Sequence, residues 1–232
     1  MSNSRKIKTE KVVLGAVLTA LVVVLQLLGS FIRFGPFSIS LVLVPIVIGA
    51  AMCGYKIGGW LGLVFGVVVL LSGDAVAFLS IDIVGTIITV LFKGTLCGLT
   101  AGVVYRMLEK HNRYLAVMVA AVVCPVVNTG IFLLGCKFFF MSAIVEWGAT
   151  AGFKNAAEYM FLGLAGGNFV FELCVNIMLA PIVLRLIKFK IIVEKFENIC
   201  YNIINKTFSF ADLLFKGCCL RTCNCVYNNF WR

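Results

Sequence analysis

Long apolar runs separated by short breaks constrain this chain more than any other feature of its sequence. Runs of about 15 residues or more alternate with short segments that carry glycine, proline or charge. A helix needs about 20 apolar residues to cross a bilayer, and soluble cores do not produce such runs repeatedly. Of the 232 residues, 62% are hydrophobic and 13% are charged, against about 45–50% and about 25% in an average soluble domain. The sequence therefore predicts an all-α membrane protein.

The apolar runs predict six transmembrane helices, at residues 12–31, 39–53, 57–72, 84–108, 114–137 and 160–187. The second and third are shorter than a straight crossing requires. No small-residue cleavage site follows the first run, so we expect a retained span there rather than a removed signal. The predicted organisation is a cytoplasmic N-terminal segment at 1–11, a membrane domain at 12–190 and a cytoplasmic tail at 191–232.

The distribution of lysine and arginine among the breaks predicts the orientation of the spans. With both termini in the cytoplasm, 16 of these residues fall inside, and three fall outside, namely Arg33, Lys137 and Lys154. Cytoplasmic loops of membrane proteins carry such an excess. The net charge of +10 is therefore explained by membrane topology, and no nucleic-acid partner is expected.

Three polar side chains fall at one predicted depth in the membrane. Lys93 and Asn128 each lie nine residues from the outer end of their span, and Glu172 lies nine residues from Gly163, where the apolar run of the last span starts. Nine residues correspond to roughly 14 Å at the rise of an α-helix. Asn168 and Asn176 lie one turn before and after Glu172. A charged side chain in hydrocarbon costs at least about 2.5–3.5 kcal/mol and normally faces a partner or a wet cavity. Two interpretations stay open: an outward-opening solute cavity, which we favour, or a Lys93–Glu172 ion pair with asparagines that only link helices.

Two outer segments are candidates to close such a cavity. Arg33 and Phe34 enter a predicted tight turn with Gly35 and Pro36, and they offer a cation and an aromatic ring to a ligand. Residues 72–82 are long enough to form a second lid. Plain connection between spans is an equal alternative for both segments.

Small residues form smooth faces on three of the predicted spans. Ala16 and Ala20 lie one turn apart near the cytoplasmic end of the first span, and glycines recur at similar spacing on the third and fourth. Such faces let two helices approach closely. We expect the glycine faces to pack inside the protein and the Ala16/Ala20 ridge to contact an external partner.

Four sequence blocks together resemble one family. They are Ala16-x-x-x-Ala20, the block from Phe34 to Gly54, Gly59-Trp-Leu-Gly-Leu-Val-Phe-Gly66, and the stretch from Lys93-Gly to Ala101-Gly102. In order and spacing over residues 10–190 they resemble the substrate-binding S components of energy-coupling factor (ECF) vitamin transporters. The resemblance implies a subunit of the prokaryotic cell membrane that captures a vitamin or related solute from outside. It also implies docking through the first helix on a transmembrane coupling subunit, which two cytoplasmic ATPases drive.

Within that family, Gly35-Pro36 and Asn128-Thr129-Gly130 look most like the pantothenate-type members. Riboflavin, cobalamin, folate and a thiamin precursor remain alternative substrates. The predicted substrate-binding residues are Arg33, Phe34, Lys93, Asn128, Asn168, Glu172 and Asn176.

Other functional classes find little support in the sequence. The chain has no phosphate-binding loop of the type that holds ATP, and the one histidine, His111, lies in a predicted cytoplasmic loop without a catalytic constellation. No enzyme activity, metal or cofactor is therefore expected. In the tail, residues 191–215 predict an amphipathic helix, and the cysteines at 218–225 lack the spacing of a zinc module. The alternative function is a structural membrane scaffold of the cell-shape type, which would not need polar residues at one depth.

Overall fold

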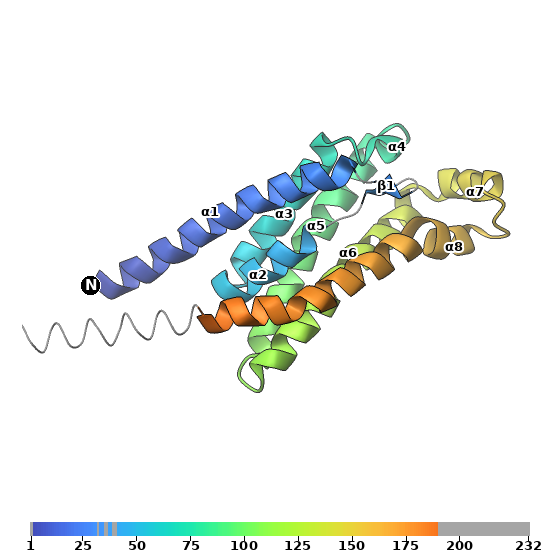
Figure 1. The fold of residues 1–232 in the computed structure, drawn as a ribbon. Coiled ribbons are helices and arrows are strands. Elements are labelled where there is room, and N and C mark those ends of the chain that lie inside the picture. Colours follow the sequence, from blue (N-terminus) through green and yellow to red (C-terminus); the bar gives the residue numbers. More distant parts are fainter. Residues whose placement is uncertain (1, 32, 35–36, 39–40, 190–232) are drawn as a thin grey trace, which may run out of the picture. The chain divides into compact units, whose positions relative to one another are not determined.

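The computed structural model describes residues 2–31, 33–34, 37–38 and 41–189 of the chain, with side chains from residue 9 onward except at 31–40 (Figure 1). The chain divides into two compact units, Met1–Arg185 and Leu186–Arg232, and the described helices lie in the first apart from the end of the last one. The predicted amphipathic segment and the cysteine-rich end of the tail lie outside the described residues.

Helices occupy all six segments that the sequence predicted as spans. They are α1 (Ser2–Phe31), α2 (Leu43–Cys53), α3 (Tyr55–Leu71), α5 (Ile83–Leu108), α6 (Arg113–Phe139) and a last helix within Ala156–Phe189. Four stretches are helical, long and apolar enough to cross a membrane, namely Thr9–Ser30, Ile83–Leu108, Arg113–Phe139 and Ala156–Phe189. The prediction of a helical membrane protein is confirmed at this level, and α2 and α3 are shorter apolar helices of 11 and 17 residues.

Local sequence signals explain where several helices begin and end. Asp82 and Asn112 cap α5 and α6, because their side-chain oxygens accept hydrogen bonds from the amides of Val84 at 3.0 Å and Tyr114 at 2.9 Å. Such caps satisfy amides that have no partner within the helix. Gly54 separates α2 from α3 with a φ of 101°, a conformation that side chains with a Cβ rarely adopt.

The helices pack through an interface of glycines between α3 and α5. A Cβ atom added at Gly58 would lie 2.6 Å from the carbonyl oxygen of Gly98, and one at Gly62 would overlap the backbone of Gly94. The two backbones therefore touch, which is how small residues stabilise helix pairs in membranes. In addition, α5 packs along α6, and α1 and α2 lie against α3. The prediction that the glycine faces pack internally is confirmed.

One end of the molecule is closed by short elements that the sequence did not predict. The segment between α6 and the last helix folds into α7 (Met141–Thr150) and α8 (Ala156–Glu158), and α4 (Val76–Leu79) lies between α3 and α5 (Figure 1). They share an apolar core of Phe78, Cys136, Phe140, Ile144, Met160 and Leu164. Two short strands, β1 (Arg33–Phe34) and β2 (Phe37–Ser38), pair antiparallel, with Phe34 opposite Phe37.

The last helix begins with an irregular turn. Residues Tyr159–Gly166 form a π-helix, η1, and an ordinary α-helix follows from residue 167. A π-helical turn inserts extra backbone into the helical spiral, and such turns occur often at functional sites. Here the irregular turn ends immediately before the polar residues of this helix.

Candidate functional site

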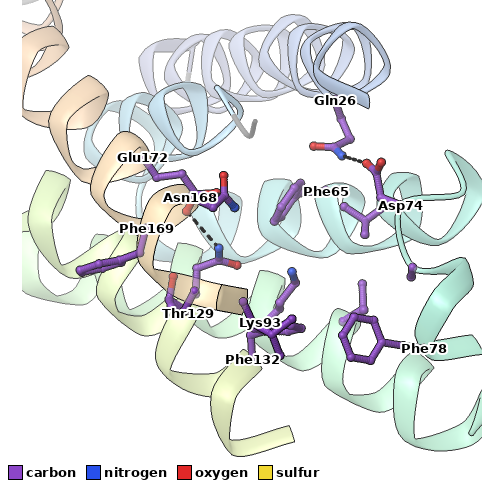
Figure 2. A pocket seen from close by; sticks show the side chains of 16 residues that line it. Gln26, Phe65, Asp74, Phe78, Lys93, Thr129, Phe132, Asn168, Phe169 and Glu172 are labelled. Carbon is purple, nitrogen blue, oxygen red and sulfur yellow. Dashed lines mark hydrogen bonds between the residues drawn. The ribbon is translucent and has the colours of Figure 1, made fainter. Parts of the chain in front are cut away.

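A cavity lies inside the bundle beside the apolar core, and Figure 2 shows the side chains around it. It offers about 70 Å³ to the centres of water-sized molecules, enough for several waters, since one needs roughly 10–15 Å³ on this measure. Its wall is contributed by α1, α3, the turn before α4, α4 itself, α5, α6 and the last helix. The lining residues are Gln26, Phe65, Val69, Asp74, Ala75, Phe78, Val90, Lys93, Asn128, Thr129, Phe132, Leu164, Ala165, Asn168, Phe169 and Glu172.

Lys93 of α5 extends its ammonium group into this cavity between two aromatic rings. Its Nζ lies 5.8 Å from the ring centroid of Phe65 and 5.2 Å from that of Phe132. Aromatic faces attract cations electrostatically, and the charges of Glu172 and Asp74 also act on the ammonium. The ring faces accept no conventional hydrogen bond, so the donors of the ammonium remain suited to a ligand.

Glu172 of the last helix forms a polar cluster on one side of Lys93. Asn128 donates through Nδ2 to Oε2 of Glu172 at 3.5 Å, and Asn168 donates through Nδ2 to Oε1 at 3.3 Å. The Glu172 side chain is 1% exposed, and a buried carboxylate requires such donors. Because the carboxylate accepts from the Nδ2 group of Asn128, the Oδ1 oxygen of this asparagine turns elsewhere, where it is buried without a hydrogen-bond partner in the described part of the chain.

Asp74 forms a second polar cluster, in the turn between α3 and α4. Gln26 of α1 donates through Nε2 to Oδ2 of Asp74 at 2.7 Å, and Ser72 donates through Oγ to the same oxygen at 3.1 Å. Gln26 is 1% exposed, and its Oε1 oxygen is buried without a hydrogen-bond partner among the described residues. Figure 2 shows the Gln26–Asp74 pair and the Glu172–Asn168 cluster on different sides of Lys93.

The residues predicted to share one depth meet at this cavity. Lys93, Asn128, Asn168 and Glu172 all line it. Asn176 does not, because it is buried one turn further along and donates to the backbone oxygen of Glu172 at 2.8 Å. The side chains of Arg33 and Phe34 lie outside the described residues.

Several lining residues were absent from the predicted set. The segment 72–82 was considered as a lid, and it contributes Asp74 and Phe78 to the wall. Gln26 was recognisable as a polar residue within the first span, but its partner 48 positions away was not. Phe65 and Phe132 carry no sequence signal that separates them from other membrane phenylalanines.

The Ala16/Ala20 ridge lies on the outer face of α1. Ala16 and Ala20 are both exposed, whereas Gly15, Leu18 and Val22 on the same helix are buried against the bundle. No described part of the chain covers the ridge. The described residues also contain no group of three or more histidine, cysteine or carboxylate side chains placed to hold a metal ion.

Comparison with known proteins agrees with this arrangement. The chain matches the family model described as "ECF transporter, substrate-specific component" over residues 10–187, which is more than half of its length. No curated protein and no solved structure gives a significant match. The family resemblance inferred from the sequence is thereby confirmed, and the chain is a component of a transporter. It belongs to the substrate-specific components of the ECF transporters.

Proposed function

We propose that this subunit captures a small, water-soluble nutrient in the Lys93 cavity. One observation carries the proposal: the Lys93 ammonium lies in a cavity that is also lined by Gln26 and Asn128, each of which has a buried amide oxygen without a hydrogen-bond partner among the described residues. Buried polar atoms in native proteins nearly always have a partner. A bound solute that supplies the missing hydrogen bonds accounts for them.

The polar groups that line the cavity indicate which chemical groups the solute should carry. Two amide oxygens require N–H or O–H donors, and the Lys93 ammonium suits a carboxylate or another strong acceptor. Phe65 and Phe132 offer apolar surface to the rest of the molecule. Pantothenate combines a carboxylate with an amide and two hydroxyls, so it is our leading candidate, ahead of riboflavin, cobalamin, folate and a thiamin precursor.

The capture subunit is proposed to cross the cell membrane six times, with both termini in the cytoplasm and the cavity open to the outside. The charge distribution supports this orientation. Under this proposal α2 and α3 complete their crossings through the segments that flank them.

The exposed Ala16/Ala20 ridge is proposed to dock on a transmembrane coupling subunit that two ATPases drive. Replacing both alanines with leucine should abolish co-purification with that subunit and leave solute binding intact. Ala149→Leu, at an exposed alanine on α7, is the matched control. Normal co-purification of the double variant would remove the docking assignment.

The capture function itself is tested with the purified wild-type chain. Small molecules released by denaturing the protein are identified by mass spectrometry, and pantothenate binding is then measured by calorimetry. A retained solute with hydrogen-bond donors and a carboxylate is the expected result. Failure to retain any solute, together with no heat of binding for the candidate vitamins, would contradict the proposal.

A further inference from the structure

A second cavity lies at the opposite end of α3 and α5, and none of the described residues that line it also lines the Lys93 cavity. It offers about 450 Å³ to the centres of water-sized molecules and is open to the surface. Basic side chains reach it from three helices, namely Lys11 of α1, Lys56 of α3 and Arg106 of α5. A neighbouring hollow shares Tyr55 and Arg106 with it and adds Lys110.

The charge in this region is predominantly positive. Among the described residues that line the two hollows, four are cations, namely Lys11, Lys56, Arg106 and Lys110, and Glu109 is the one carboxylate. Cations from separate helices that converge on one cavity match a multivalent anion such as a phosphate group. The hollow therefore has the electrostatics of an anion site.

The side chain of Tyr105 points to a ligand independently of these charges. Tyr105 lines the cavity and is 4% exposed. Its hydroxyl forms no hydrogen bond with the part of the chain that the structure describes, although buried tyrosines usually find a partner for this group. A phosphate oxygen held by Lys56 and Arg106 would accept that hydrogen bond.

The surroundings of the cavity place it at the level of lipid headgroups. Tyr55 lines it, and Trp60 and Tyr114 are exposed near the same ends of α3 and α6, at 56% and 51%. Tyrosine and tryptophan gather where hydrocarbon meets water. Val103 and Met107, both exposed, line the neighbouring hollow and offer an apolar surface next to the charges.

We propose that this cavity binds the headgroup of an anionic phospholipid. Lys11, Lys56 and Arg106 hold the phosphate, the Tyr105 hydroxyl donates to it, and an acyl chain follows Val103 and Met107. Glu109 disfavours a second phosphate and accepts a hydrogen bond from a hydroxyl of the headgroup. The best match is a phosphodiester with a hydroxylated headgroup, such as phosphatidylglycerol.

The test uses the full chain purified in a neutral detergent. Native mass spectrometry measures the retention of dioleoylphosphatidylglycerol and of dioleoylphosphatidylcholine by the wild type and by Lys56→Gln/Arg106→Gln. Each cation near a membrane surface is worth about 1 kcal/mol, or about fivefold, so the double variant should lose phosphatidylglycerol affinity by about 25-fold. Tyr105→Phe should lose about three- to tenfold, as expected for one hydrogen bond.

The control is Lys137→Gln/Lys154→Gln, which removes two exposed lysines that line neither hollow. It should retain phosphatidylglycerol as the wild type does. Equal retention of both lipids by the wild type, or equal losses in both double variants, would overturn the site. Displacement of the lipid by millimolar inorganic phosphate would overturn the lipid as its occupant and identify a free phosphate instead. Unchanged lipid retention alongside loss of co-purification with the coupling subunit would identify the cavity as a protein contact.

Discussion

The contact between α3 and α5 has two halves that do different things. In one half, Gly58 and Gly62 press against the backbone of α5 at Gly98 and Gly94. In the other half, Phe65 of α3 and Lys93 of α5 hold the same two helices around a cavity. Backbone contact leaves no room for a ligand and fixes the spacing of the helices, whereas side chains of different length leave a space between them.

Residues that are adjacent in the sequence contribute to the backbone contact and to the cavity. Gly94 follows Lys93 directly, and Gly66 follows Phe65. Successive side chains on a helix point about 100° apart, so the glycine faces the neighbouring helix while the residue before it faces the cavity. The comparison teaches that one helix pair supplies both a tight backbone contact and part of the wall of the Lys93 cavity. Substitutions in the two halves should therefore separate effects on stability from effects on solute affinity.

The largest effect is expected at the glycine half. Gly62→Leu would drive a side chain into the backbone of Gly94, which cannot move aside as a flexible side chain would. We expect a loss of at least about 3 kcal/mol, the upper end for overpacking, seen as a collapse of the yield of folded protein and of its melting temperature in detergent.

The matched control for that substitution is Gly130→Ala on α6, where an added Cβ atom meets nothing within 4 Å. It should be neutral or stabilising by up to about 1 kcal/mol, since alanine is the better helix former. If Gly62→Leu melted at the temperature of the wild type, the glycine half would not fix the spacing of α3 and α5.

The second largest effect is expected at Lys93. Lys93→Met keeps most of the side-chain volume and removes the charge, so solute affinity should fall by about 1.5–3 kcal/mol, as for a hydrogen bond to a charged group. Calorimetry with the retained solute measures the loss, and the melting temperature without solute reports stability separately.

The double variant Lys93→Met/Glu172→Leu distinguishes solute binding by Lys93 from a purely structural ion pair between Lys93 and Glu172. If the two residues serve only each other, replacing either one alone should destabilise the bundle and the double variant should recover both stability and uptake. Under the binding interpretation the double variant stays defective in solute binding. Normal uptake in the double variant would therefore exclude Lys93 from the solute site.

A smaller loss of solute affinity should distinguish Asn128 from Asn176, which were both predicted to bind substrate. Asn128→Ala should weaken solute binding by about 1–3 kcal/mol, because a buried polar group of the ligand loses its partner. Asn176→Ala is the control, since Asn176 is equally interior but bonds to the backbone of Glu172 away from the cavity. Equal affinity losses in the two variants would contradict the assignment of Asn128 to the site.

Much of the fold was predictable because the bilayer imposes a simple rule. Apolar runs and their breaks located six helices, and helical rise placed Lys93, Asn128 and Glu172 at one depth before any contact was known. The glycine spacing on α3 and α5 likewise predicted a close contact. These features depend on periodicity and hydropathy, which a single sequence carries directly.

The remaining features depend on contacts between distant segments. The π-helix Tyr159–Gly166 shifts the face that Asn168 presents, and no residue type marks such a turn. The hydrogen bond from Gln26 to Asp74 joins α1 to a turn that hydropathy treats as connection. The sequence did not predict α7, because its residues resemble an outer loop. Its position is fixed by packing on Phe78 and Phe140.

The smallest effect is expected at the aromatic rings around Lys93. Phe132→Leu removes the ring whose centroid lies 5.2 Å from the ammonium, and a desolvated cation–π contact of this kind is worth about 0.5–2 kcal/mol. Without it the ammonium is held less firmly in the cavity, so solute affinity should fall by a few-fold and less than in Lys93→Met. Phe138→Leu is the control on the same helix, because that ring is 75% exposed. Calorimetry on both variants decides whether the ring contributes: if the two affinities match that of the wild type, Phe132 only fills space beside Lys93, and the cavity half of the interface binds its solute through hydrogen bonds alone.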